Sequence, residues 1–174
     1  ETHRGRTPLP AARTVADSLC EQLGERPDIT RIDIAGSVRR GRETIGDVDI
    51  LVATDAPEEV TAAFADFPEV DELIAGGASK ASARLMDGLQ VDLRFVDPSH
   101  WGAALHYFTG SKRHHVELRT RAKREGLKVS EYGVFRQEAD EPIAAETEAE
   151  VFAALDLPYI APELREGAGE IERA

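Results

Sequence analysis

Apolar residues recur along the first part of the chain with two spacings, one typical of helices and one typical of strands. Residues 8 to 24 place them every three or four positions, which predicts a helix with one buried face. Residues 29 to 36 alternate isoleucine with polar residues, which predicts a strand that ends at Gly36. We expect a second strand over residues 47 to 53 and a helix over residues 56 to 67.

Three strand-like runs follow, over residues 70 to 76, 80 to 86 and 89 to 96. Asp87-Gly88 separates the last two runs and is a strong hairpin signal, because glycine accepts the positive φ that a tight turn needs. Together these elements predict a small α/β unit built on a mixed sheet.

The pattern changes after residue 98. Residues 99 to 110 and 111 to 126 predict two helices, each ended by glycine, and short strands and an acidic helix over residues 146 to 157 follow. Proline and glycine punctuate the remaining residues, which indicates a linker rather than a core element. We therefore expect three parts, with bounds 1–98, 99–157 and 158–174.

Composition bounds the class of protein. With 174 residues, 41% of them apolar, the chain can fill one core or two small ones. A single cysteine excludes an intrachain disulfide, no apolar run reaches the roughly 20 residues of a membrane helix, and the first residues lack a signal-peptide core. We expect a cytoplasmic, reduced setting. The chain does not begin with Met, so we expect a part of a longer protein.

The charge alters the expected partners. The formal net charge is -12, from 33 acidic and 21 basic residues, and only four of the basic residues are lysines. Such an acidic, lysine-poor composition suits a high-salt cytoplasm, which we hold as a hypothesis of a halophilic source. The net charge argues against nucleic acid as a partner unless basic residues gather locally.

Asp47 and Asp49 are two residues apart on an expected strand, so both side chains point to one face. Asp92 lies between apolar residues of another strand and needs a partner there. A bare pair of this kind is more often an ordinary polar face, but Ile50 and its neighbours indicate a buried strand on which adjacent carboxylates repel. Oxygen ligands of this kind suit two Mg²⁺ ions, with Mn²⁺ possible.

A phosphate site is expected just upstream. Gly36-Ser37 ends one strand and opens a short helical turn, where backbone N–H groups and a hydroxyl can bind phosphate oxygens. Among the following arginines, Arg40 is best placed to bind phosphate, and Gly46 allows close backbone approach. Each arginine taken alone is more often a solvated charge. No His/Cys spacing suits zinc, and the adjacent His114 and His115 are expected on the surface.

Three separated motifs carry a family resemblance. GSVRRG followed by GDVDILV resembles the nucleotidyltransferase signature, and YFTGS within residues 104 to 135 resembles the family X DNA polymerases, the relatives of DNA polymerase beta. LDLPYIAPELREGAGEIE resembles the segment that joins such polymerases to a PHP phosphoesterase domain in bacterial and archaeal members. The resemblance implies an α+β fold: a nucleotidyltransferase palm with a mixed sheet, followed by a small α/β thumb.

The resemblance also implies roles. Asp47 and Asp49 would bind both metal ions, and Asp92 would bind the catalytic one and help deprotonate the primer 3′-OH. The implied nucleotide-binding residues are Gly36, Ser37, Arg40, Gly46, Tyr107, Phe108, Gly110, Lys112 and His115. The implied DNA contacts are Arg94, Arg119, Arg121 and Lys123. In this family the glycine–serine bond of YFTGS is commonly cis, which here is Gly110-Ser111.

His115 departs from the family pattern, because many members have asparagine there to contact the base. Lyase, helix-hairpin-helix and PHP segments are also missing from the chain, so we expect it to contain palm and thumb only. We expect the native protein to join these parts to such domains and to be a monomer. Residues 112 to 128 carry seven basic and two acidic residues, a local footprint for template-primer on an anionic molecule. The alternative is a solvated helix face with Glu117–Arg121 pairing.

The sequence therefore predicts a template-directed DNA polymerase core that adds dNTPs to a primer in DNA gap repair. Two alternatives stay open: a nucleotidyltransferase that uses another acceptor, and a DNA-binding module that is inactive without its other domains.

Overall fold

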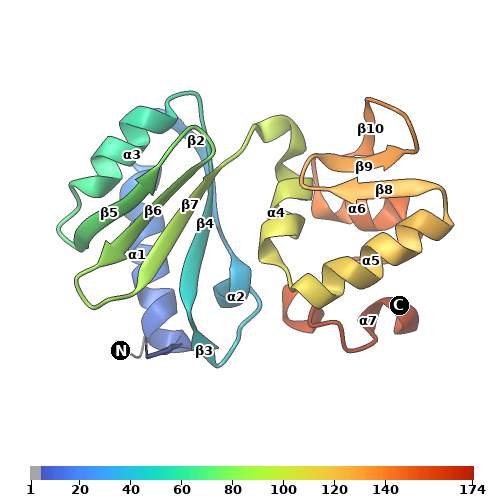
Figure 1. The fold of residues 1–174 in the computed structure, drawn as a ribbon, viewed down its shortest axis with the longest axis horizontal. Coiled ribbons are helices and arrows are strands. Elements are labelled where there is room, and N and C mark those ends of the chain that lie inside the picture. The colour runs from blue at the N-terminus through green and yellow to red at the C-terminus, as the bar shows by residue number, and fades with distance from the viewer. Residues whose placement is uncertain (1–4) are drawn as a thin grey trace. The chain divides into compact units, whose positions relative to one another are not determined.

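The computed structural model describes residues 5–174, and the chain divides into two compact units. The first ends at Val96 and the second begins at Asp97, within two residues of the boundary expected after residue 98. Figure 1 shows a sheet with helices in the first unit, and helices with a small sheet in the second. The fold is mixed, as expected.

The first unit is a five-stranded mixed sheet with helices. Its sheet has the order β2-β4-β7-β6-β5, in which β4 and β7 are parallel and the other neighbours antiparallel. Two short strands, β1 and β3, form a separate pair that the apolar pattern did not predict. The elements are β1 (Thr7–Pro8), α1 (Leu9–Gly24), β2 (Ile29–Ala35), α2 (Gly36–Arg39), β3 (Thr44–Ile45), β4 (Asp47–Thr54), α3 (Pro57–Ala65), β5 (Val70–Gly76), β6 (Lys80–Leu85) and β7 (Gln90–Phe95).

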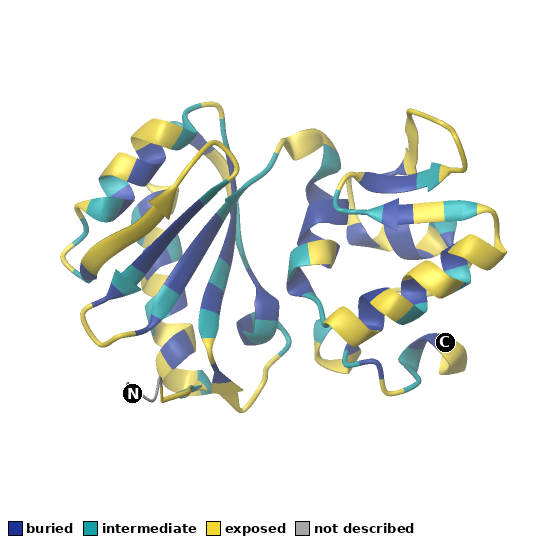
Figure 2. Ribbon diagram, viewed as in Figure 1, coloured by how far each residue is buried: buried dark blue, intermediate teal, exposed yellow. Residues whose placement is uncertain are grey.

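One face of this sheet forms a core with α1 and α3. The buried face of α1 has helical spacing, and alternate residues of β4 and β7 meet it, each such aliphatic side chain contributing about 1.5–3 kcal/mol by its burial. Figure 2 shows β4 and β7 largely buried and the edge strand β5 exposed. The opposite face of the sheet carries the polar alternate residues of β4 and β7, so the chemistry of this unit lies away from α1 and α3.

The second unit packs helices against a three-stranded antiparallel sheet of order β10-β9-β8. Its core includes Leu118 and Ala122 of α5 and Val151 and Phe152 of α6. Ser111 caps α5, as its side chain accepts a hydrogen bond from the His114 N–H. The elements are η1 (Pro98–His100), α4 (Trp101–Thr109), α5 (Lys112–Arg124), β8 (Leu127–Ser130), β9 (Gly133–Arg136), β10 (Pro142–Ala144), α6 (Glu148–Ala154), η2 (Pro162–Leu164) and α7 (Glu170–Arg173).

The last residues differ from the linker tail expected over residues 158–174. Ile160, Arg165 and Ile171 are buried, and both isoleucines belong to the core of the second unit. Isolated buried positions between proline and glycine residues have no helical or strand periodicity, which is why the pattern indicated a linker. Among residues 5–174, no helix combines the length and apolar character needed to cross a membrane.

Gly102 provides a test of packing in the second unit. A side chain at this position would run into the backbone of Thr147, at the N-terminus of α6, so the close approach of α4 to α6 requires glycine. We expect Gly102→Ala to lower the free energy of unfolding by about 2 kcal/mol or more. Gly24→Ala is the matched control, because its added methyl group meets only Ile32 at an ordinary contact distance. Urea unfolding of both variants measures the difference, and equal effects would contradict the packing argument.

Candidate active site

The parallel pairing of β4 with β7 brings two acidic residues together. Asp49 is directly opposite Asp92 in the register, and Asp47 is opposite Gln90. Directly paired residues of neighbouring strands point to the same face, and Asp47 and Asp49 share a face because they are two apart. All three aspartates therefore lie on the polar face of the sheet, away from α1 and α3.

Asp92 is held by two neighbours on that face. Asp92 as a residue is 5% exposed, and its Oδ1 accepts hydrogen bonds from Ser82 Oγ at 2.6 Å and from Gln90 Nε2 at 3.1 Å. Ser82 pairs with Asp92 across β6 and β7, so the same register supplies both the acid and its donor. These bonds fix the orientation of the carboxylate. The polar alternation of residues 80, 82 and 84 was the signal in the sequence that could have identified Ser82.

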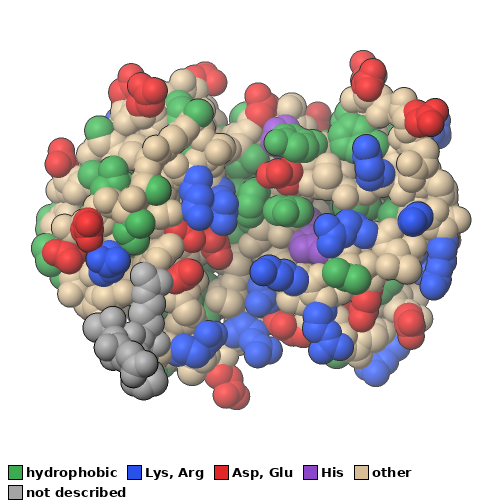
Figure 3. Space-filling model, in the orientation of Figure 1, with side chains coloured by type: hydrophobic (Ala, Val, Ile, Leu, Met, Phe, Trp, Pro, Cys, Tyr) green, Lys and Arg blue, Asp and Glu red, His purple; other side chains and the backbone are tan. Residues whose placement is uncertain are grey.

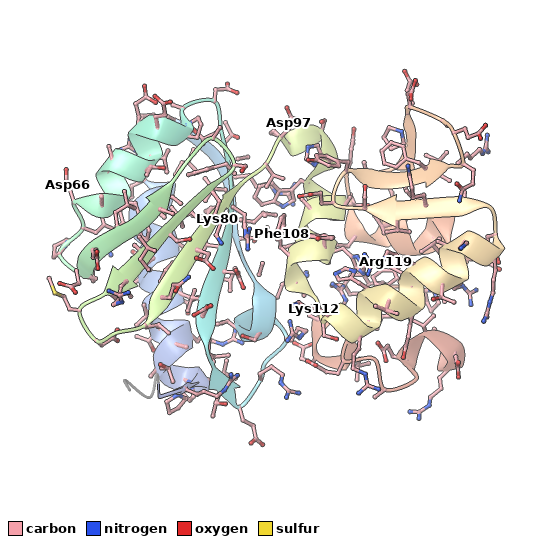
Figure 4. The ribbon with its side chains drawn as sticks, viewed as in Figure 1. Asp66, Lys80, Asp97, Phe108, Lys112 and Arg119 are labelled. Carbon is pink, nitrogen blue, oxygen red and sulfur yellow. The ribbon has the colours of Figure 1, made fainter. Side chains whose placement is uncertain are left out.

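The pKa of Asp49 is raised to about 6, mainly by burial and also by the charges of Asp92 and Asp47, while the charges of Arg94 and Lys80 oppose the rise. Figure 4 shows Lys80 at the sheet of the first unit. A carboxylate with a raised pKa is one whose ionised form lacks sufficient positive charge nearby. A divalent cation would supply that charge, so this donor set fits a magnesium-like ion.

The three aspartates do not form a closed ligand cluster by themselves. Within residues 5–174, no group of three or more His, Cys, Asp or Glu side chains is arranged so that it could hold a metal ion. The register gives one close pair, Asp49 and Asp92, with Asp47 beside it on the same strand. Ions bridged partly by a bound substrate fit this arrangement better than a cage made by protein alone.

Gly36 begins α2 directly after β2, and Ala35 pairs with Asp49 in the neighbouring strand. The φ of Gly36 is +62°, and a side chain at this position would run into the Asp49 carboxylate. Glycine is therefore required twice, by the backbone conformation and by the close approach. Ser37 and Arg40, expected to bind phosphate, are half-buried in and just after α2, and Gly46 precedes β4 on the exposed surface.

The second unit carries the remaining nucleotide-binding residues expected from the sequence. Tyr107 and Lys112 are exposed, Phe108 is half-buried, and the rings of Tyr107 and Phe108 meet edge to face at 5.0 Å. The Gly110-Ser111 peptide bond is cis, as the family resemblance implied. These residues occupy the end of α4 and the start of α5.

The expectation that His114 and His115 lie on the surface is wrong. His114 is fully buried and His115 is 8% exposed, because α5 packs this end against α4. His115 Nε2 donates a hydrogen bond to the Tyr107 carbonyl at 2.8 Å, and burial lowers the pKa of His115 to about 4. His115 is therefore neutral at pH 7. The spacing of His114 with Leu118 and Ala122 on α5 could have predicted its burial.

The basic residues of α5 divide into two groups. Lys112, Arg119 and Lys123 are exposed, and Figures 3 and 4 show basic side chains along this helix. Arg121 is half-buried instead, and its guanidinium donates to the carbonyls of Leu155 at 2.9 Å and Asp156 at 3.3 Å. Arg121 thus binds the end of α6 rather than the Glu117 carboxylate that we considered for it.

Comparison with known proteins identifies relatives of the chain. The family described as DNA polymerase beta thumb matches residues 104–166. The chain is 38% identical over 169 residues to DNA polymerase/3′-5′ exonuclease PolX of Bacillus subtilis, a match that covers 96% of the chain. The chain belongs to family X of the DNA polymerases. It is also 26% identical over 159 residues to DNA polymerase lambda of Rattus norvegicus, with 75% of the chain covered.

The chain spans under a third of these family X relatives, 30% of the Bacillus protein and 28% of the rat protein. A shorter match, 31% identical over 100 residues, is to the carbamoyl phosphate synthase large chain of Halobacterium salinarum, and it covers 55% of the chain and 9% of that protein. The family X matches cover more of the chain, so they guide the interpretation of its site.

Asp49 gives a pH-dependent test of the carboxylate site. A folded-state pKa of about 6 lies above the ordinary value, so ionising Asp49 lowers the free energy of unfolding as the pH rises from about 4 to 7. Without divalent ions, we expect Asp49→Asn to be more stable than the parent by about 1–3 kcal/mol at pH 7 and equal to it near pH 4.

The free energies of unfolding of the parent and Asp49→Asn also test the fit to a cation. Adding Mg²⁺ at pH 7 should narrow the difference in free energy between the two, because a cation stabilises the ionised carboxylate of the parent. Asp71→Asn, at an exposed position of the same sheet, is the control and should show neither effect. A difference that does not change between pH 4 and 7 would contradict the assigned pKa.

Proposed function

We propose that this chain is the palm and thumb of a template-directed DNA polymerase that adds dNTPs to a primer 3′-OH, in DNA gap repair. The observation that carries the proposal is the register of Asp49 opposite Asp92, with Asp47 on the same face. It is supported by the similarity of the chain to polymerases of family X. The parts named palm and thumb are residues 1–98 and 99–157.

In this proposal Asp47, Asp49 and Asp92 hold two divalent ions, Mg²⁺ or Mn²⁺. When bound, such ions stabilise the attacking and departing oxygens of an in-line phosphoryl transfer. Asp92, oriented by Ser82 and Gln90, helps to take the proton of the primer hydroxyl. Gly36 leaves room for the Asp49 carboxylate, which a side chain at position 36 would run into.

The other residues of the site bind rather than react. Ser37, Arg40 and Gly46 would contact the triphosphate, and Arg40 brings a bidentate donor for its oxygens. Tyr107, Phe108 and Gly110 would contact the sugar. Further contacts with the base and with DNA are proposed for Lys112, His115, Arg94, Arg119 and Lys123. Arg121, also expected there from the sequence, binds the carbonyls at the end of α6 instead.

The wider setting is also a proposal. The family X relatives that the chain matches are more than three times longer than the part it covers, which supports fusion of this chain to further domains. From the resemblance we propose lyase, helix-hairpin-helix and PHP domains. We also propose a monomeric protein and, from the composition, a cytoplasmic location. A halophilic source is proposed from the net charge of -12.

Primer extension on gapped DNA tests the reaction. We expect the chain to add the templated dNTP only when Mg²⁺ or Mn²⁺ is present, and Asp92→Asn to reduce the rate by roughly 100-fold or more, because a charge that acts on the reacting atoms is removed. Asp66→Asn, at an exposed position, is the control. Extension that ignores the template would favour another nucleotidyltransferase, and DNA binding without extension would favour an inactive module.

The two groups of arginines on α5 give a second test. Arg119→Ala should weaken DNA binding for all sequences and reduce the salt dependence of log K by about one phosphate contact, with stability unchanged. Arg121→Ala should instead lower the free energy of unfolding by about 1 kcal/mol, since it loses hydrogen bonds to α6. Fluorescence anisotropy with labelled DNA and urea unfolding separate the two effects. Equal behaviour of the two variants would contradict the assignment.

A further inference from the structure

The C-terminal residues hold the start of α5. The Ser111 N–H donates to the carbonyl of Arg165 at 2.9 Å, and Gly167 lies so close to Arg113 that a side chain on it would clash. Gly167 has a φ of +70°, so glycine also suits its backbone. We call residues 160–171 the C-terminal clamp. It fixes the peptide that follows Gly110.

A buried chain of hydrogen bonds links the C-terminal clamp to α4 and α5. Glu170 Oε1 accepts a hydrogen bond from His114 Nδ1 at 2.8 Å, and His114 Nε2 faces His106 Nε2 at 3.0 Å. His106 is 1% exposed and His114 fully buried. Because a carboxylate only accepts, His114 must carry its proton on Nδ1, and a neutral His114 then accepts from a His106 that is protonated on Nε2.

The groups around Glu170 keep its carboxylate ionised. Burial raises the pKa of Glu170, but the hydrogen bonds from His114 and from the Gly167 and Ala168 N–H groups lower it more, so the pKa lies below its ordinary value. Those N–H groups lie at 2.9 Å and 2.8 Å from the carboxylate oxygens. Glu170 is thus an ionised acceptor for three donors, all within the second unit.

Arg165 anchors the other end of the clamp. Its side chain is fully buried, and it donates to Glu148 Oε2 at 2.6 Å and to the Ile160 carbonyl at 2.9 Å. The guanidinium also lies over the rings of Phe152 and Tyr159, at 5.1 Å and 5.4 Å from their centres. A buried charge that is paired and stacked in this way holds the segment in one place.

His106 and His114 lie on either side of residues 107–113 in the chain, so the hydrogen bond between them affects that segment. His106 directly precedes Tyr107, and His114 follows the Gly110-Ser111 turn by three residues, so their contact closes a loop around residues 107–113. His115, next to His114 on α5, donates a hydrogen bond to the Tyr107 carbonyl on α4. The residues proposed to contact the nucleotide sugar therefore lie between two points that the network ties together.

We infer that Glu170, acting through His114 and His106, is a positioning residue for sugar selection, which sets how well the site prefers a dNTP to an rNTP. The inference rests on the proposed polymerase function. Loss of the Glu170 carboxylate frees the loop that His106 and His114 close, and the contact with the sugar becomes less specific. The effect should appear in nucleotide binding and selection more than in the chemical step.

Glu170→Gln in the full chain tests the inference, with Glu172→Gln as the matched control. Glu172 is an exposed residue on the same helix, so the control makes the same charge change on the surface of α7. In gapped-DNA extension we expect Glu170→Gln to raise KM for dNTP and to lower the preference for dNTP over rNTP by about 10-fold, the effect of one hydrogen bond to a charged group. We expect kcat to change less than about twofold and the control to match the parent.

Histidine NMR of the parent at pH 7 provides a readout without catalysis. We expect a proton on His114 Nδ1 and on His115 Nε2, with the His114 signals shifted in Glu170→Gln and not in Glu172→Gln. A His114 without a proton on Nδ1 would overturn the network. A folded Glu170→Gln variant with parental KM and selectivity would overturn the positioning role.

Two other results, a Glu170→Gln variant that does not fold and a parent that extends no primer, are interpreted separately. If Glu170→Gln does not fold, Glu170→Asp replaces it: the shorter side chain keeps the charge but draws away from His114, and unchanged selectivity would again overturn the inference. If the parent extends no primer with any dNTP, the proposed function fails and the inference about sugar selection fails with it. The NMR result then still reports whether the buried network exists.

Discussion

The parallel pairing of β4 with β7 is the constraint on which the candidate site depends. It sets Asp49 opposite Asp92, and the antiparallel pairing of β6 then sets Ser82 opposite Asp92 on the same face. A shift of one residue in the register would turn the acidic side chains into the core beneath α1 and α3. The apolar residues that alternate with them, such as Val48 and Ile50, resist that shift because they would lose their burial.

The electrostatics of the site follow from the same packing. Asp49 lies on the face of the sheet away from α1 and α3, but the start of α2 lies against its carboxylate. Burial therefore disfavours the ionised form of Asp49 even though Arg94 and Lys80 are near. The fold thus keeps two acidic residues in adjacent strands at a cost in stability. A cost of this kind at a functional position is common in proteins, because a binding site needs charges that a core would exclude.

Much of the first unit could be predicted from the sequence, because its signals are local. Alternation around Asp49 and Asp92 predicted strands and a shared face, and the spacing within residues 8–24 predicted α1. That β4 and β7 would be neighbours could only be supposed. The second unit was harder to predict: Arg121 and Arg165 look like ordinary surface residues in the sequence. The helical spacing of His114 with Leu118 and Ala122 indicates burial, but not its partner Glu170, which lies 56 residues away. Arg121 binds carbonyls 34 and 35 residues away, which no local pattern predicts.

Gly36 shows how the geometry restricts variation in this protein. Its positive φ and the Asp49 carboxylate that an added side chain would meet both disfavour substitution at this position. Changes in substrate preference would therefore arise more readily at neighbouring positions that carry a side chain, such as Ser37. The rigid point of the site is a residue without a side chain, and diversification is confined to its surroundings.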